Sequence, residues 1–113
     1  MTETVFGKII KGEIPCDKVY EDETILVIKD IHPVAPVHFL IMPKKEIPDL
    51  QSMNEEDLSL LQDVARVAQK LAKDYNLQKG YRLLTNNGPL AGQSVFHLHF
   101  HLIGGRRLTH GLG

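Results

Sequence analysis

The sequence has a single cysteine, Cys16, and no tryptophan. One thiol cannot close an intrachain disulfide and gives no Cys-x-x-Cys spacing for a metal, so we expect a protein of a reducing compartment. Uninterrupted apolar runs reach only four or five residues, whereas a transmembrane helix needs about 20. The opening Met1-Thr2-Glu3 is not typical of a signal peptide. We therefore predict a cytoplasmic protein and expect no membrane as a partner.

Acidic residues are absent from the last 39 positions, because Asp74 is the final carboxylate of the chain. Residues 1–74 carry a formal charge of −5 and residues 75–113 a charge of +4, which together give the net charge of −1. The acid-free part also holds four of the six histidines. A segment rich in donors and cations suits an anionic ligand such as a phosphate. Its four Lys and Arg residues are too few for a broad nucleic-acid footprint, so we expect no nucleic acid as a partner.

The length of 113 residues and the apolar content of 42% are typical of one globular domain, which we expect over residues 1–113. The pattern predicts a short helix over 5–10 that Gly12 ends, and a hairpin of strands at 19–21 and 24–29. A strand at 38–42 and a long helix from Asn54 to just before Gly80 follow, with strands at 81–86 and 95–103. Most connections between strands are too short for a crossover helix, so we predict an antiparallel α+β domain.

The long helix carries apolar residues at alternating spacings of three and four, which is typical of one buried face. On this spacing we expect its core face to comprise Leu58, Leu61, Ala65, Ala68, Ala72 and Tyr75, with Leu71 beside them.

Three histidines, His97, His99 and His101, alternate with apolar residues near the end of the chain. In a strand, side chains two residues apart share one face and lie about 6.5–7 Å apart. The alternation therefore predicts a row of three imidazoles on one face of the strand at 95–103. Packing alone does not readily explain such a row.

Two chemistries compete for this row. A zinc site would use two of the histidines, completed by His38, His32 or a carboxylate from the first 74 residues. Covalent catalysis at phosphorus would use the middle imidazole as nucleophile, with neighbouring donors for the phosphoryl oxygens. The acid-free surroundings favour the second interpretation, because a nearby carboxylate would repel a phosphate. The candidate donors are Gln93, Ser94, His97 and His101, and glycines in the loop 86–94 would let backbone amides approach the anion.

Residues 92–106, GQSVFHLHFHLIGGR, resemble the signature of the histidine triad (HIT) family and of its Hint branch, the purine nucleoside phosphoramidases. Two further blocks are similar to those of the family. The first is Asp30-Ile31 with Pro33, Ala35-Pro36 and His38, followed by Pro43-Lys44-Lys45; the second is Gly80-Tyr81-Arg82 followed by Asn86. The resemblance covers nearly the whole chain.

The resemblance implies a HIT-like fold and a homodimer in which two five-stranded antiparallel sheets join. It also implies hydrolysis of purine nucleoside 5′-phosphoramidates, such as AMP-lysine-type or aminoacyl-adenylate-type substrates, to the nucleoside monophosphate. The reaction would pass through a covalent nucleotidyl-histidine and would need neither a cofactor nor a metal. The alternative is a purine nucleotide-binding regulatory or interaction protein of the same fold in which hydrolysis is incidental.

Residue by residue, the resemblance makes His99 the nucleophile. His101 and Ser94 would contact the α-phosphate and assist the leaving group, while His97 and His38 would orient the nucleophile. The remaining nucleotide-binding positions are Asp30 for the ribose hydroxyls, Asn86, Gly92, Gln93 and Val95 on the phosphate side, and Phe6, Ile9 and Ile31 around the base. Hint members often end in a Trp-Pro-Pro-Gly tail that reaches the active site of the partner subunit. Residues 108–113 of this chain do not match that tail and contain no tryptophan. The resemblance therefore gives no basis for predicting selectivity for the leaving group.

Overall fold

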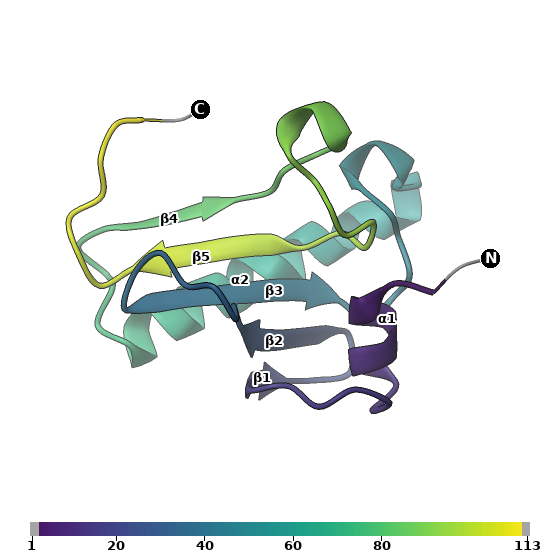
Figure 1. The fold of residues 1–113 in the computed structure, drawn as a ribbon, viewed down its shortest axis with the longest axis horizontal. Helices are drawn as coiled ribbons and strands as arrows, with labels where there is room; N and C mark the ends of the chain where they lie inside the picture. The colour runs from purple at the N-terminus through teal and green to yellow at the C-terminus, as the bar shows by residue number, and fades with distance from the viewer. Residues whose placement is uncertain (1–2, 112–113) are drawn as a thin grey trace.

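The computed structural model describes residues 3–111 and contains one five-stranded antiparallel sheet in the order β1-β2-β3-β5-β4. Helix α2 lies behind the sheet and α1 lies on its other face (Figure 1). The elements are α1 (Val5–Ile10), β1 (Lys18–Glu21), β2 (Ile25–Lys29), β3 (Val37–Pro43), α2 (Ser59–Asp74), β4 (Tyr81–Leu84) and β5 (Phe100–Gly104). Three short 3₁₀ turns are η1 (Leu50–Ser52), η2 (Glu55–Leu58) and η3 (Pro89–Ala91). The predicted fold class is confirmed.

Local chemistry explains where the N-terminal elements begin and end. The Thr4 hydroxyl caps α1 by accepting a hydrogen bond from the Gly7 N–H at 3.0 Å, and Gly12 follows the helix with a φ of +80°. The Asp22 carboxylate closes the turn between β1 and β2 by accepting from the N–H groups of Thr24 and Ile25, at 2.9 and 2.8 Å. These contacts place α1 and the hairpin as the sequence predicts.

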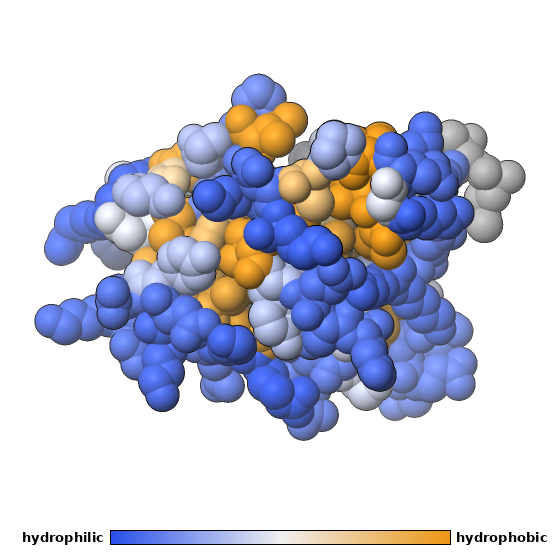
Figure 2. Space-filling view, turned by 90° about the horizontal axis from the view of Figure 1, so that it is seen from below, coloured by the Kyte–Doolittle hydropathy of each residue, from blue (hydrophilic) through white to orange (hydrophobic). Residues whose placement is uncertain are grey.

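The sheet is covered on both faces, so β2 and β3 are apolar on both sides. On the α2 face the buried cluster comprises Ile25, Val27, Phe39, Ile41, Val64, Val67, Ala68, Leu71 and Leu102. On the α1 face it comprises Phe6, Leu26, Ile28, Leu40 and Met42. In the view from below, polar residues cover most of the surface and apolar residues show as an interrupted band (Figure 2).

The buried face of α2 differs from the predicted one. Val64, Val67, Ala68, Leu71 and Ala72 are its buried residues. Leu58 and Tyr75 are 41% and 43% exposed, Ala65 is exposed and Leu61 is half-buried. The two candidate stripes share Ala68 and Ala72 and lie side by side on the helix, and the sheet packs on the one that contains the valines. The helix also begins at Ser59 instead of Asn54, because residues 55–58 form the tighter turn η2.

Strand β5 begins at Phe100, five residues later than expected. Before it, the Leu98 N–H donates to the Ile47 carbonyl at 2.7 Å, and the His97 ring bonds the Pro43 carbonyl at 2.7 Å. The ladder between β3 and β5 ends at the pair of Ile41 and Phe100, and Pro43, two residues further along β3, has no N–H with which to continue it. Residues 95–99 therefore leave the sheet and follow the segment after β3. Among residues 3–111, no helix is long and apolar enough to cross a membrane.

Candidate functional site

A cavity of about 380 Å³ lies on the α1 face of the sheet, and segments far apart in the sequence form its walls. The eleven residues that the sequence assigns to nucleotide binding all line it: Phe6, Ile9, Asp30, Ile31, Asn86, Gly92, Gln93, Ser94, Val95, His99 and His101. The predicted set is therefore brought together in one place.

His99 lies immediately before β5, and hydrogen bonds hold both its ring and its backbone. Its Nδ1 is 2.7 Å from the His97 carbonyl oxygen. Because a carbonyl can only accept, Nδ1 carries the proton and Nε2 keeps its lone pair. The His99 carbonyl in turn accepts a hydrogen bond from the Thr85 hydroxyl at 2.7 Å, and the Phe6 ring packs edge-on against the imidazole at 4.8 Å between centroids. His99 thus presents an unprotonated, fixed nitrogen.

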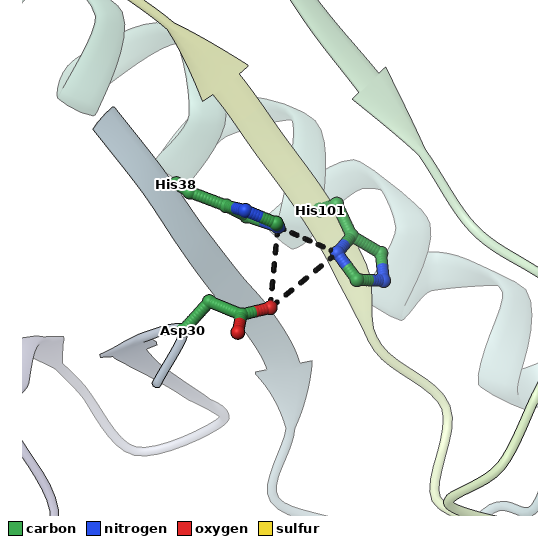
Figure 3. A group of neighbouring side chains, drawn as sticks. All are labelled: Asp30, His38 and His101. Atoms are coloured by element: carbon green, nitrogen blue, oxygen red, sulfur yellow. Dashed lines mark hydrogen bonds and ion pairs between the residues drawn. The ribbon is translucent and has the colours of Figure 1, made fainter. Parts of the chain in front are cut away.

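His101, in β5, has the opposite proton arrangement because of His38 in β3. The Val34 N–H donates to His38 Nδ1 at 3.2 Å, so neutral His38 carries its proton on Nε2. That Nε2 lies 2.9 Å from His101 Nδ1 and 3.2 Å from Asp30 Oδ2, as Figure 3 shows. His101 Nδ1 therefore accepts, and the His101 proton resides on Nε2.

Asp30, His38 and His101 also form a trio with the spacing of metal ligands, since their three ligand atoms lie 2.9, 3.2 and 4.0 Å from one another. A metal on His38 Nε2 would require the proton to move to Nδ1. That proton would then face the Val34 N–H, so two donors would oppose each other. Metal-bound histidines instead donate their second N–H to an acceptor. The hydrogen-bonding pattern of His38 does not fit a metal ligand, and the zinc interpretation loses its candidate ligand set.

The four histidines around the site favour their neutral forms. Burial lowers the pKa of His38, His97, His99 and His101 below the ordinary value of 6.5. The neighbouring rings of His99 and His38 lower the pKa of His101 further, while the Asp30 carboxylate acts in the opposite direction on it. At neutral pH, His99 is therefore available as a base.

His97 does not share the cavity with the other two rings. It is 2% exposed and bonds the Pro43 carbonyl through Nε2, whereas the rings of His99 and His101 lie 5.4 Å apart and both line the cavity. The prediction that all three imidazoles lie on one strand is wrong, because His97 and His99 precede β5, although the Phe6 ring lies edge-on to both, with centroids 6.5 and 4.8 Å away. The expectation that the His97 ring is a donor to phosphate is also wrong. Its backbone carbonyl, not its ring, contacts His99.

Gln93 lines the cavity, but its amide group is used to shape the loop. Its Nε2 donates to the carbonyls of Pro48 and Val95, at 2.8 and 3.0 Å, and its Oε1 accepts from the Gly88 N–H at 2.8 Å. Both amide hydrogens are thereby occupied, so direct donation to phosphate by this side chain is not expected. Gly88 and Gly92 adopt φ values of +93° and +92° in the same loop, a conformation that glycine tolerates best.

Five residues of the cavity wall escaped the sequence analysis: Val5, Ile28, Lys29, His32 and Leu40. Strands β2 and β3 are apolar on both faces, so no alternation shows which of their residues turn toward a cavity. Val5 is adjacent to Phe6, and His32 donates its backbone N–H to Asp30 Oδ1 at 2.8 Å. Proximity to assigned residues was the only available signal for these two.

The comparisons with known proteins agree with the fold and with the resemblance. The family model for the HIT domain matches residues 11–108, and the chain belongs to the HIT family. A HIT-like protein of Chlamydia muridarum is 54% identical over 102 residues, which are 90% of this chain and 81% of that relative.

Solved structures extend the likeness to three dimensions. A HIT family hydrolase from Legionella pneumophila has a TM-score of 0.94 and 45% identity, covering 98% of this chain and 100% of that one. A histidine triad nucleotide-binding protein from Candida albicans has a TM-score of 0.85 and 38% identity, covering 98% of this chain and 83% of that one.

Proposed function

We propose that this chain is a hydrolase of the Hint type that cleaves purine nucleoside 5′-phosphoramidates without a metal. The observation that carries the proposal is the 2.7 Å bond from His99 Nδ1 to the His97 carbonyl, which leaves the lone pair on Nε2. A buried neutral imidazole with one fixed tautomer is suited to nucleophilic attack. The similarity of this chain to a hydrolase from Legionella pneumophila and to a nucleotide-binding protein from Candida albicans supports this chemistry.

In the first step, His99 Nε2 attacks the α-phosphorus and a P–N bond forms as the P–N bond to the leaving amine breaks. The departing nitrogen takes up a proton that comes from solvent water. The Nε2–H of His101 can donate a hydrogen bond to that nitrogen and so stabilise its departure, because its Nδ1 is held as an acceptor by His38. The hydroxyl of Ser94, which lines the cavity, can donate to a phosphoryl oxygen in the same step.

In the second step, water attacks the phosphorus of the nucleotidyl-histidine and the bond to His99 Nε2 breaks. The attacking water loses a proton to solvent, which balances the proton taken up by the leaving amine, and Nε2 of His101 keeps its N–H throughout. Cleavage of the bond restores neutral His99 and yields AMP or GMP. Catalysis of this kind depends on positioning and charge stabilisation more than on new covalent groups.

The cavity offers separate surroundings for the parts of a nucleotide. Its volume of about 380 Å³ lies within the range of small-molecule sites. Asp30, already oriented by the His32 N–H, can accept from ribose hydroxyls. The apolar side chains of Phe6, Ile9 and Ile31 form the base side, while Asn86, Gly92 and Val95 lie on the phosphate side with Ser94. An apolar base wall accommodates both purines.

A homodimer is part of the proposal. β4 is an edge strand of the sheet, and edge strands expose backbone groups that can pair with another chain. Tyr81 and Leu83 on β4 are more than a third exposed, as are Leu58 and Tyr75 on α2. A second copy that pairs its own β4 here would cover exposed apolar residues on the α2 side. Sedimentation of the wild type and of Leu83→Lys tests this, with a dimer and a monomer expected respectively.

The proposed activity is tested with an adenosine phosphoramidate in the presence of EDTA. The wild type should release AMP, and His99→Ala should not, while AMP binding to the variant remains measurable by calorimetry. His110→Ala is the matched control, because it removes an exposed histidine remote from the cavity. Unchanged turnover by His99→Ala would refute the nucleophile, and loss of wild-type turnover on chelation would refute metal independence.

A further inference from the structure

We propose that Arg106 is a positioning residue for His101 that acts through the Val34 backbone and the His38 ring. The inference rests on the proposed function, because it concerns which nitrogen of His101 carries the N–H that hydrogen-bonds the leaving amine. The tautomers of the His38 and His101 rings can also be measured in the ligand-free protein, without any substrate.

Three hydrogen bonds connect Arg106 to His101. Arg106 Nε donates to the Val34 carbonyl at 3.1 Å. On the other side of the same residue, the Val34 N–H donates to His38 Nδ1 at 3.2 Å. His38 Nε2 then lies 2.9 Å from His101 Nδ1. Arg106 follows the end of β5 by two residues, so the strand that carries His101 also holds the loop that orients His38.

The contact between this loop and the turn after β5 is close. Gly105 has a φ of +93°, and a Cβ at that position would lie 3.1 Å from Pro36 Cβ and 3.5 Å from the Val37 nitrogen. A glycine is therefore needed for the turn to approach the loop, and this approach brings the Arg106 guanidinium within reach of Val34.

Neutral His38 has two possible proton positions, and only one of them makes Nε2 of His101 a hydrogen-bond donor. With the proton on Nε2, His38 donates toward His101 Nδ1 and Asp30, and His101 keeps its proton on Nε2. With the proton on Nδ1, His38 would oppose the Val34 N–H and turn a lone pair toward Asp30 Oδ2 at 3.2 Å. His101 would then have to donate from Nδ1, and its Nε2 would carry no N–H. The Val34 N–H thus selects the active arrangement.

Side-chain burial does little to hold Val34 in place. Its side chain is 56% exposed, and Ile31 in the same loop is 86% exposed. The loop is closed at its base by the bond from the Asp30 N–H to the His38 carbonyl at 3.0 Å. At Val34 itself, the backbone is held by the hydrogen bond that Arg106 Nε donates to its carbonyl. Loss of that bond would let the Val34 amide turn away from His38.

The test measures ring ¹⁵N chemical shifts in the ligand-free full chain labelled at histidine, together with steady-state hydrolysis of an adenosine phosphoramidate. In the wild type we expect His38 and His101 to carry their protons on Nε2. In Arg106→Ala, both rings should shift toward mixed tautomers, and kcat should fall about fivefold, the effect of one hydrogen bond, with KM nearly unchanged. Arg107→Ala, which removes the same charge one residue away, should match the wild type in both measurements.

A second variant, Val34→Pro, deletes the N–H donor itself and should shift the tautomers further than Arg106→Ala. Ring shifts in Arg106→Ala identical to those of the wild type would overturn the proposal, whatever the activity. If the wild type did not hydrolyse the phosphoramidate while Arg106→Ala still changed the tautomers, the proposed function would fail and the positioning role would stand.

Discussion

His99 and His101 hold their protons on opposite ring nitrogens, although they are two residues apart and their ring centroids are 5.4 Å apart. His99 donates from Nδ1 to the His97 carbonyl at 2.7 Å, and His101 accepts at Nδ1 from His38 at 2.9 Å. As a result, Nε2 of His99 carries a lone pair and Nε2 of His101 carries an N–H donor. Cleavage of a phosphoramidate can use both, a lone pair to attack phosphorus and a donor to hydrogen-bond the leaving nitrogen.

Protein stability should fall as the pH drops below the ordinary pKa of histidine. Burial lowers the pKa of His97 and His99 in the folded chain below the ordinary 6.5, so the unfolded chain binds more protons in this range. The free energy of unfolding therefore rises with pH up to about the unfolded pKa and then levels off. Urea titrations at several pH values between about 5 and 8 measure this slope. His97→Gln should flatten it; a slope of the opposite sign contradicts the assignment of neutral buried rings.

Removal of the Thr85 hydroxyl should slow chemistry without weakening nucleotide binding. The hydroxyl holds the His99 carbonyl at 2.7 Å, just where the ladder between β4 and β5 has ended at Leu84 and His101. Thr85→Val keeps the shape of the side chain, so kcat should fall about fivefold while the Kd for AMP changes little. Thr85→Ser restores a hydroxyl and should recover most of the rate. Equal rates for the valine and serine variants would show that the hydroxyl has no positioning role.

A leucine in α2 and one in η2 just before it differ in burial, although the sequence places both on or beside the core face of the helix. Leu71 is 2% exposed against the sheet, while Leu58 is 41% exposed. Leu71→Ala should reduce the free energy of unfolding by about 2–5 kcal/mol, whereas Leu58→Ala should cost less than about 0.5 kcal/mol in the monomer. Urea unfolding of both variants in the Leu83→Lys background, which we expect to be monomeric, provides the comparison. A larger loss for Leu58→Ala would mean that the helix packs on its other face.

The sequence was sufficient for the order of the elements, and it identified eleven of the residues that line the cavity but not the whole of its wall. Apolar runs and turn residues located the helices and the strands of the sheet, and the block around His99 located the cavity. The face of α2 was harder to predict, because Ala68 and Ala72 belong to both candidate stripes. Only the sheet, whose strands are distant in sequence, decides between Val64 and Leu61 as its neighbours.

The direction of the His97 ring could not be predicted for a similar reason. The alternation of His and apolar residues continues without a break from His97 to Leu102, yet the strand begins at Phe100. The ladder with β3 ends at Phe100 and Ile41, and beyond it the His97 ring donates to the carbonyl of Pro43, 54 residues away in the sequence. The Val34 amide is similarly invisible in the sequence, because it acts through its backbone.

The central claim is a covalent bond between His99 Nε2 and the α-phosphorus of the substrate. Intact-mass analysis of enzyme quenched with acid-free denaturant during turnover of an adenosine phosphoramidate tests it most directly. We expect a fraction of the wild-type chain to gain one adenylyl group, which peptide mapping places on His99 and which is missing from His99→Ala. Turnover without any adduct on the wild-type chain, together with inversion at a chiral α-phosphorus, would indicate direct attack by water and would contradict the account.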